Sequence, residues 1–370
     1  MDFRIEKKDF LRPLGILQGI AERRSSIPAL SNVFLESNQD SLRLTTTDLE
    51  TTMIVDIPCS VKGTGKLCVS ARKLYEIIRE LPEAEISVQG MDNHWAKITC
   101  KSAVFNLSGI EPIEFPSLPS YSEKDLSTIK SFDLREMIEK VIFAASTEES
   151  RYHLNGIFFE CVSVQDANVA RMVATDGHRL ALIDRESPDF SEMQQGAIVP
   201  KRGLNEVRKI LGEFSGELSL SVSQNIFVLK VSPFVIIIRL IDGEFPDYRQ
   251  VIPEGNDKLV KLQTKEFASC LRRVSTISTD RVEGIKFTLK SGVIELYSSS
   301  QDIGNAMEEF PAGYDGGEMN VGFNARYVLE ALNEIDEDEF FLELKDETSA
   351  AIMRPASGRN PLYVIMPMRV

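Results

Sequence analysis

The length of 370 residues predicts two or three domains, and the apolar fraction of 43% predicts a packed protein rather than a disordered one. A net charge of −14 argues against a protein that simply coats nucleic acid, unless basic residues gather on one surface. The opening residues have no apolar signal core, and no run reaches the roughly 18 apolar residues of a membrane span, so a cytoplasmic protein without a membrane partner is expected.

The cysteines and histidines are few and scattered. Five cysteines occur without a CxxC pair, which fits a reducing compartment better than a disulfide framework. Only three histidines are available, so a histidine-rich metal site is nearly excluded. We therefore expect neither a metal nor another cofactor.

Taken in chain order, the predicted elements repeat three times. Each third begins with a strand that leads into an amphipathic helix, continues with an apolar strand and an alternating strand, and then has a second helix. The predicted helices lie in 4–23, 70–81, 130–146, 200–214, 261–278 and 324–335. This order predicts an α+β fold of three pseudo-repeated domains, each with two helices packed on antiparallel sheets. Linker-like segments place the domains at 1–126, 127–253 and 254–370.

The segment "KGTGKLC" at 62–68, before the second helix, resembles the end of a phosphate-binding loop. The pattern requires glycine where Ser60 stands, and serine or threonine where Leu67 stands. Since strand-like runs flank the segment, a hairpin turn is the better interpretation, and ATP hydrolysis is not supported.

Several predicted helices carry cations opposite their apolar stripe. Leu74 and Ile78 oppose Arg72 and Arg79 in the second helix. The same division places these cations on other helices: Lys8, Arg12, Arg23, Lys201, Arg202, Arg208, Lys209, Lys265 and Arg272. Exposed helix faces are commonly charged, but if the repeats present these faces on one surface, they suit the phosphates of a duplex. Contact with the backbone rather than the bases is expected.

The segment "ATDGHRLAL" at 174–182 places Asp176, His178 and Arg179 together, as in a catalytic relay. A nucleophile at a defined spacing is missing, and Asp-Gly commonly makes a turn between strands. The run "DEDE" at 336–339 is interpreted as a solvated loop rather than a metal site.

The chain resembles the bacterial replicative sliding clamp, the β subunit of DNA polymerase III. The matching pieces are "IPALSNV", "TDLE", "RYHLNGIFFE", "ATDGHRLAL", "FPDYR", "GFNARYVLEALN" and "YVIMPMRV", which span the chain in order. The resemblance implies a non-catalytic processivity factor, a head-to-tail homodimer that forms a ring around double-stranded DNA.

The resemblance also implies site residues. The DNA-facing positions would be Arg24, Arg72, Tyr152, His153, Lys201 and Arg202, with Glu148 in a stretch that touches DNA in relatives. The pocket for partner peptides would contain Arg151, Leu154, Thr175, Gly177, His178, Arg179, Leu180, Pro246, Val251, Asn324, Tyr327, Val364, Met366, Pro367 and Met368. Its leucine, valine, proline and methionine side chains suit an adaptable apolar groove. Phe105 and Ile277 are candidates for the dimer interface.

The implied partners are the replicative DNA polymerase, an ATP-driven clamp loader, and other polymerases and repair proteins that carry short Gln/Leu/Phe peptides. Gln250 stands where some relatives have a second arginine, so the peptide preference of this chain is expected to differ. Two alternatives stay open on the residues themselves. One is a repeat-built peptide-binding module that never touches DNA, and the other is a hydrolase that uses Asp176 and His178.

Overall fold

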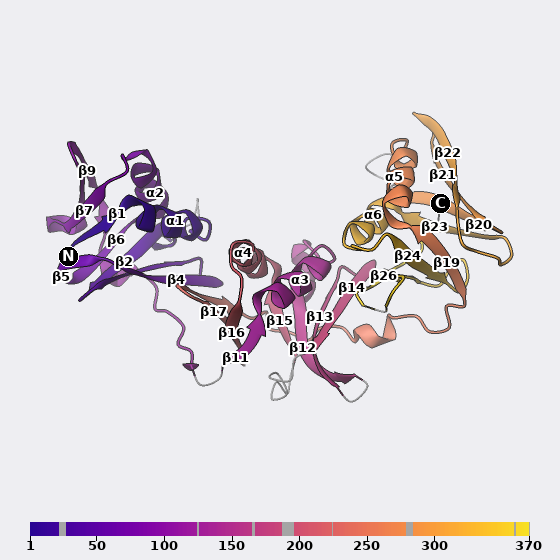
Figure 1. Cartoon of the computed structure of the whole chain (residues 1–370), viewed down its shortest axis with the longest axis horizontal. Coiled ribbons are helices and arrows are strands. Elements are labelled where there is room, and N and C mark those ends of the chain that lie inside the picture. Colours follow the sequence, from indigo (N-terminus) through magenta and orange to yellow (C-terminus); the bar gives the residue numbers. More distant parts are fainter. Residues whose placement is uncertain are drawn as a thin grey trace. The chain divides into compact units, whose positions relative to one another are not determined.

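The computed structural model describes residues 1–21, 27–123, 126–164, 167–186, 196–223, 225–278, 284–358 and 360–369. The described residues form six α-helices, at the predicted positions: α1 (Lys7–Leu17), α2 (Ala71–Glu80), α3 (Ser131–Ile142), α4 (Lys201–Leu211), α5 (Thr264–Ser275) and α6 (Ala325–Asn333) (Figure 1). Within this described part, no helix combines the length and the apolar character that a membrane crossing requires. All five cysteines are free thiols.

The chain divides into two compact units that are discontinuous in sequence. Unit 1 contains Met1–Arg135 and Arg202–Leu240, and unit 2 contains Glu136–Lys201 and Ile241–Val370. The central repeat therefore contributes to both units.

The helices of unit 1 show how the amphipathic pattern is used. In α2, Leu74 and Ile78 are buried while Arg72 and Arg79 are exposed, as the pattern predicts. Helix α1 packs against α2. At their contact the buried Lys7 side chain donates from Nζ to the carbonyl oxygen of Arg79 at 3.0 Å, and thereby satisfies a carbonyl at the C-terminal end of α2.

Unit 1 holds two antiparallel sheets. One sheet has the order β5 (Ser60–Gly63), β1 (Asp2–Glu6), β7 (Glu85–Gly90), β8 (Ala96–Cys100) and β9 (Ala103–Leu107). The other has the order β10 (Gly109–Ile110), β6 (Gly65–Ser70), β2 (Asn32–Asn38), β3 (Ser41–Thr47), β4 (Thr51–Pro58), β18 (Phe234–Arg239), β17 (Ile226–Val231), β16 (Glu217–Val222) and β11 (Ser127–Lys130).

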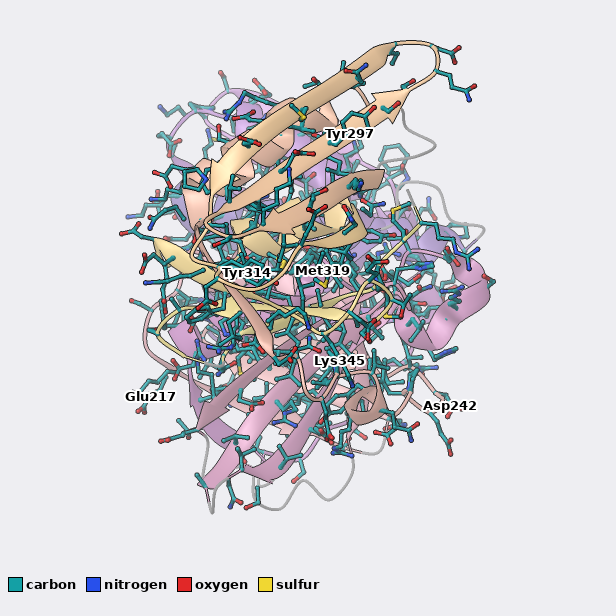
Figure 2. The ribbon with its side chains drawn as sticks, turned by 90° about the vertical axis from the view of Figure 1, so that its right-hand side faces the viewer. Glu217, Asp242, Tyr297, Tyr314, Met319 and Lys345 are labelled. Atoms are coloured by element: carbon teal, nitrogen blue, oxygen red, sulfur yellow. The ribbon has the colours of Figure 1, made fainter. Side chains whose placement is uncertain are left out.

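Unit 2 likewise holds two antiparallel sheets. One has the order β15 (Ala197–Pro200), β12 (Gly156–Val164), β13 (Ala167–Thr175), β14 (Arg179–Glu186), β26 (Leu362–Ile365), β25 (Ala351–Pro355), β24 (Glu339–Leu344) and β19 (Lys258–Gln263). The other has the order β22 (Gly304–Pro311), β21 (Val293–Ser300), β20 (Gly284–Lys290) and β23 (Met319–Asn324). Tyr297 marks the β21–β22 hairpin in Figure 2, and Met319 marks the start of β23.

In both units one sheet joins strands from two repeats. Strand β4 of the first repeat pairs with β18 of the second, and β14 of the second pairs with β26 of the third. Because the strands of different repeats exchange backbone hydrogen bonds, the sheets continue from one repeat into the next. The domain boundaries near Leu126 and Pro253 do not separate these sheets, so they stay a prediction from the sequence.

The segment at 62–68 corrects one prediction. It contains the end of β5 and the start of β6, and these strands do not form the predicted hairpin: β5 pairs with β1, whereas β6 pairs with β2. The chain thus passes from one sheet to the other at this point. A Cβ atom on Gly65 would lie only 2.8 Å from the backbone nitrogen of Met1, so glycine allows the close approach.

Candidate functional site

The segment at 174–182 forms the predicted turn, between the paired strands β13 and β14. The Oδ1 atom of Asp176 accepts hydrogen bonds from the backbone N–H groups of His178 at 3.0 Å and Arg179 at 3.1 Å. Gly177 has φ = +88°, a left-handed conformation that favours glycine. The Thr175 hydroxyl donates to the carbonyl oxygen of Arg179 at 2.6 Å and so closes the turn. The aspartate therefore shapes the turn.

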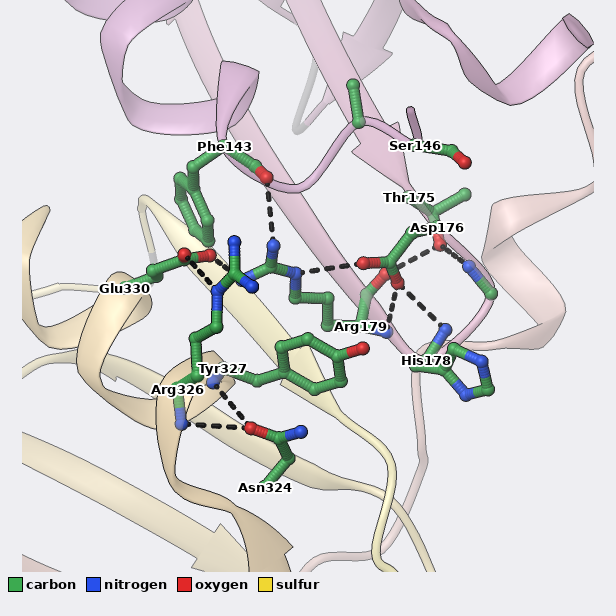
Figure 3. Close-up of polar contacts among 12 residues, drawn as sticks. Phe143, Ser146, Thr175, Asp176, His178, Arg179, Asn324, Arg326, Tyr327 and Glu330 are labelled. Atoms are coloured by element: carbon green, nitrogen blue, oxygen red, sulfur yellow. Dashed lines mark hydrogen bonds and ion pairs between the residues drawn. The ribbon is translucent and has the colours of Figure 1, made fainter. Parts of the chain in front are cut away.

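Arg179 is buried at the centre of a network of polar and aromatic contacts (Figure 3). Its guanidinium donates to Asp176 Oδ2 at 3.1 Å, to the carbonyl oxygen of Phe143 at 2.9 Å, and to the Glu330 carboxylate. It also lies over the Tyr327 ring, with Cζ 4.5 Å from the ring centroid. Two carboxylates and an aromatic face thus stabilise the buried charge, and in return the arginine orients Tyr327.

Tyr327 and His178 form one wall of the predicted peptide pocket. The two rings are stacked with their centroids 6.4 Å apart and their planes 18° apart. Tyr327 lies in the first turn of α6, which Asn324 caps, because its side-chain oxygen accepts from the backbone nitrogens of Arg326 at 2.9 Å and Tyr327 at 3.4 Å. Asn324 therefore lies next to Tyr327 as the N-cap of α6, and its part in the peptide pocket stays a prediction.

The C-terminal segment is tied to the same wall. The backbone nitrogen of Met366 donates to the carbonyl oxygen of His178 at 2.9 Å, and that of Met368 donates to Gly322 at 2.8 Å. The Met366 side chain is 41% exposed, whereas Pro367 and Met368 are partly buried. The structure thus brings the two ends of the predicted pocket together, although they lie far apart in the sequence.

Apolar side chains form the floor of the pocket. Leu180 and Val364 are cross-strand partners on β14 and β26, and both are buried in a cluster with Tyr248. Two residues that flank the short 3-10 helix Tyr248–Gln250 are exposed. Val251, which follows the helix, is 41% exposed, and Pro246, which precedes it, is also exposed. Leu154 is buried. An apolar floor with an exposed rim of proline, valine and methionine can accept an apolar side chain.

Tyr248 links the floor to a partly buried ionic network that the sequence does not indicate. Its hydroxyl donates to Glu160 at 2.5 Å and accepts from Arg171 at 2.9 Å. Arg171 in turn makes two hydrogen bonds to Asp184, at 2.7 and 2.8 Å. Burial raises the pKa of Tyr248, so its hydroxyl stays protonated and holds the 3-10 helix against the sheet. The motif "FPDYR" contains Tyr248, but it does not indicate the partners Glu160 and Arg171.

A polar cavity of about 360 Å³ lies beside the network, entirely within unit 2. Lys201, predicted to face DNA, lines it together with Arg179 and Arg326. The Lys201 ammonium donates to the carbonyl oxygen of Ala145 at 2.9 Å, and burial, followed by repulsion from Arg179, lowers its pKa. Lys201, the first residue of α4, is thus partly buried in the lining of this cavity, and its contact with DNA stays a prediction.

The other predicted DNA residues are arranged in several ways. Arg72 is exposed and donates to Glu76 at 2.8 Å, and Arg202 lies 3.1 Å from an Asp48 oxygen. Tyr152 is 52% exposed in the 3-10 helix Glu149–Leu154. His153, in the same helix, is partly buried, and Arg24 lies outside the described residues.

Arg151 belongs to the pocket side of that same 3-10 helix. Its Nη1 atom donates to the carbonyl oxygen of Asp176 at 2.8 Å, and its Nε lies 3.4 Å from the Glu148 carboxylate. The negative charge of Glu148 is therefore partly neutralised by a neighbouring arginine.

The two dimer candidates lie on different units. Phe105 is 38% exposed on β9, at one end of its sheet, and Ile277 is partly buried just after α5. Residues 336–338 of the "DEDE" run form a loop that leads into β24, and Glu339 is the first residue of that strand. Asp336 in this loop pairs with Lys140 at 2.7 Å. Across the described residues, no group of histidine, cysteine and acidic side chains has the arrangement of a metal site.

The Glu330 carboxylate is expected to make the free energy of unfolding sensitive to acid. Burial raises its pKa, but hydrogen bonds from Arg326 and Arg179 outweigh that effect and hold the pKa below its usual value. Such a group stabilises the folded state above its unfolded pKa, and this contribution is lost as the pH falls through the folded value. We expect Glu330→Gln to lower the free energy of unfolding by about 1–2 kcal/mol at pH 7, with the difference from the wild type narrowing in acid.

Urea unfolding at pH 7, 5 and 4 measures this difference. The matched control is Glu347→Gln, which changes an exposed glutamate and should cost little at any of these pH values. A Glu330→Gln penalty that stays constant down to pH 4 would contradict the proposed ion pair.

Comparison with known proteins agrees with this geometry. The family models for the N-terminal, central and C-terminal domains of the DNA polymerase III beta subunit match residues 1–119, 128–247 and 249–369. The chain is 33% identical over 372 residues to the beta sliding clamp of Caulobacter vibrioides (strain NA1000 / CB15N), and 31% identical over 371 residues to that of Pseudomonas putida (strain KT2440). Each comparison covers 100% of both chains.

Solved structures give the same result. The DnaN sliding clamp from Bartonella birtlesii bound to griselimycin superposes with a TM-score of 0.96 at 34% identity, with 100% of both chains covered. The DNA polymerase III subunit beta from Pseudomonas aeruginosa has a TM-score of 0.95 at 31% identity, also with complete coverage of both chains. The chain therefore belongs to the β sliding clamp family, the β subunit of DNA polymerase III, which is a non-catalytic processivity factor of DNA replication.

Proposed function

We propose that this protein encircles duplex DNA as a head-to-tail homodimer and tethers the replicative DNA polymerase through the pocket around Leu180 and Val364. The observation that carries the proposal is the match of all three β-subunit domains, in order, along the chain. Its physical logic is that a closed ring holds DNA by topology, so that contacts with phosphates can stay weak enough for sliding.

The charge distribution supports this arrangement. The chain carries a net charge of −14, yet exposed cations lie on α1, α2, α4 and α5, for example Arg12, Arg72, Lys209 and Lys265. Helices of this kind that face a central opening would attract the phosphate backbone, while the acidic remainder would discourage nonspecific coating.

Two exposed strands support the dimer. Among the described residues, β9 stands at one end of its sheet in unit 1, and β22 stands at one end of its sheet in unit 2. Both carry exposed apolar side chains, namely Val104 and Phe105 on β9 and Met307 on β22. Edge strands with exposed apolar residues readily pair with another chain. We therefore infer that β9 of one subunit adds to β22 of the next.

The pocket supports the tether. Its apolar floor, the stacked His178 and Tyr327 rings and the flexible Met366 side chain suit a short peptide with a leucine and a phenylalanine. Arg151 and Tyr327 lie where they can bind the polar ends of such a peptide. The partners in this proposal are the replicative polymerase, other polymerases, repair proteins and the ATP-driven clamp loader, and the compartment is the cytoplasm.

Because the ring requires a dimer, the oligomeric state tests the proposal. We expect light scattering to give twice the 41.5 kDa mass of one chain. Phe105→Asp should weaken the dimer by about a hundredfold or more, because a charge would replace an aromatic anchor at the interface. A wild-type protein that stays monomeric at micromolar concentration would contradict the ring.

The matched control for this test is Phe132→Asp. Phe132 is 70% exposed on α3 and belongs to neither edge strand, so the same substitution there should leave the dimer intact. If light scattering gives the same mass for the two variants, β9 is not part of the dimer interface.

A further inference from the structure

A second cavity lies on the same sheet as the pocket floor. It has a volume of about 430 Å³, and its apolar lining residues include Ile252, Leu259, Ile352 and Leu362. All of them belong to unit 2. Leu259 is 46% exposed on β19, and the next residue, Val260, is buried, because successive side chains of this strand point to opposite faces of the sheet. An exposed leucine on the rim of a cavity is free to contact a ligand.

One row of cross-strand partners connects this cavity to the pocket. Leu180 pairs with Val364, Val364 with Ile352, Ile352 with Glu343, and Glu343 with Leu259. Directly paired residues lie on the same face of a sheet, so the five side chains form a continuous line from the pocket floor to the cavity.

Two apolar residues are shared by the pocket floor and the cavity. Ile252 and Leu362 pack against the buried cluster of the pocket floor and also line the cavity. The two depressions therefore share apolar residues and belong to one surface.

The charged residues of the cavity are already engaged with each other. Arg354 donates from Nε to the Glu343 carboxylate and from Nη1 to the carbonyl oxygen of Gly358 at 3.0 Å, and it lies over the Phe341 ring at 4.9 Å. Because this ion pair is largely buried, a charged ligand would have to disrupt it. The cavity thus suits an aliphatic side chain rather than a carboxylate or an ammonium group.

We propose that this cavity binds an additional aliphatic residue of the same partner peptide that occupies the pocket. The proposal rests on the proposed function, since it requires a peptide at Leu180 and Val364. It adds a second anchor point, outside the Gln/Leu/Phe segment, that selects among partners by the sequence flanking that segment.

The sheet geometry gives the position of this residue. Leu259 is three strands away from Val364 in the order β26, β25, β24, β19. Neighbouring strands lie about 4.8 Å apart, so the distance along the row is about 14 Å. An extended peptide advances about 3.3 Å per residue, which places the second anchor about four residues from the side chain at Val364.

Fluorescence anisotropy with synthetic peptides tests the inference on the full-length protein. The reference is a short Gln-Leu-Phe-type peptide. Extended versions carry leucine three, four or five residues beyond the core on either side, and each is paired with a serine version of the same length. We expect one leucine-extended peptide to bind about fivefold more tightly than its serine version, because a leucine side chain becomes partly buried.

Two variants of β19 identify the cavity. Leu259→Ser should abolish the advantage of leucine over serine and leave the affinity of the short peptide unchanged. Lys261→Ser, on the same strand and the same face but outside the cavity lining, should preserve the advantage.

The outcomes separate the inference from the proposed function. If the short peptide does not bind the wild-type protein, the pocket itself is wrong, and the inference falls with it. If the short peptide binds but leucine gives no advantage at any position, or the advantage survives Leu259→Ser, only the second anchor is overturned.

Discussion

On a nicked circular plasmid, protein loaded by the clamp loader with ATP is expected to stay bound through a wash with about 1 M salt, and linearising the plasmid should release it. At this ionic strength the Debye length falls to about 3 Å, so attraction between exposed cations and phosphates is nearly eliminated. A topological link does not depend on charge and survives the wash. Gel filtration of the plasmid, followed by quantification of the bound protein, measures retention.

The structure gives a reason to expect weak phosphate contacts. Lys73 and Arg72 both donate to Glu76, at 2.8 Å each. These two hydrogen bonds lower the pKa of Glu76 to about 2, and the one from Lys73 has the larger effect. Arg202 is similarly paired with Asp48. Cations that already have acidic neighbours bind phosphate less strongly, which favours sliding over stalling.

A linear plasmid of the same sequence is the control. A protein held only by about 6–10 phosphate contacts would lose about 10³–10⁵-fold in affinity between about 50 and 200 mM salt, whether the DNA is circular or linear. Equal salt sensitivity on the two forms would contradict topological tethering and would favour a peptide-binding module that never encloses DNA.

The second large effect is expected from a truncation that removes the residues from Met366 onward. Binding of a Gln-Leu-Phe-type peptide should weaken by about a hundredfold or more, because the pocket loses the Met366, Pro367 and Met368 side chains together. The truncation also removes the backbone hydrogen bond from Met366 to His178, which ties this segment to the wall of the pocket. Isothermal titration calorimetry measures the affinity.

The truncated chain should keep its fold and its dimer. Strand β26 ends at Ile365, so no residue of the sheet is removed, and light scattering should give the wild-type mass. A truncated protein that binds the peptide as tightly as the wild type would eliminate this pocket as the peptide site. A loss of the dimer would show that the segment also supports the interface.

The helices and several turns could be predicted from the sequence, because each depends on neighbouring residues. The spacing of Phe10, Leu14 and Leu17 predicts one buried face, and all three are buried in α1. The Asp176–Gly177 pair predicts a turn, and the structure has one there, with Gly177 in a left-handed conformation.

The chemistry around Arg179 could be predicted only in part. Arg179 belongs to the motif "ATDGHRLAL", but its partners Phe143 and Glu330 lie 36 and 151 residues away. The sequence likewise contains no local signal that Tyr248 joins Glu160 to Arg171, or that Lys201 reaches Ala145. These contacts depend on packing between distant segments.

The thrice-repeated order of elements, the amphipathic helix faces and the family of the protein follow from the sequence, because periodicity, turn residues and motifs are local properties of a chain. The pairing of the strands is visible only in the folded chain: β5 and β6, adjacent in sequence, enter different sheets, while β14 joins β26 from another repeat. The physical reason is that strand pairing follows from burying apolar faces and satisfying backbone hydrogen bonds across the whole unit. The row from Leu180 to Leu259 exists only because of that pairing.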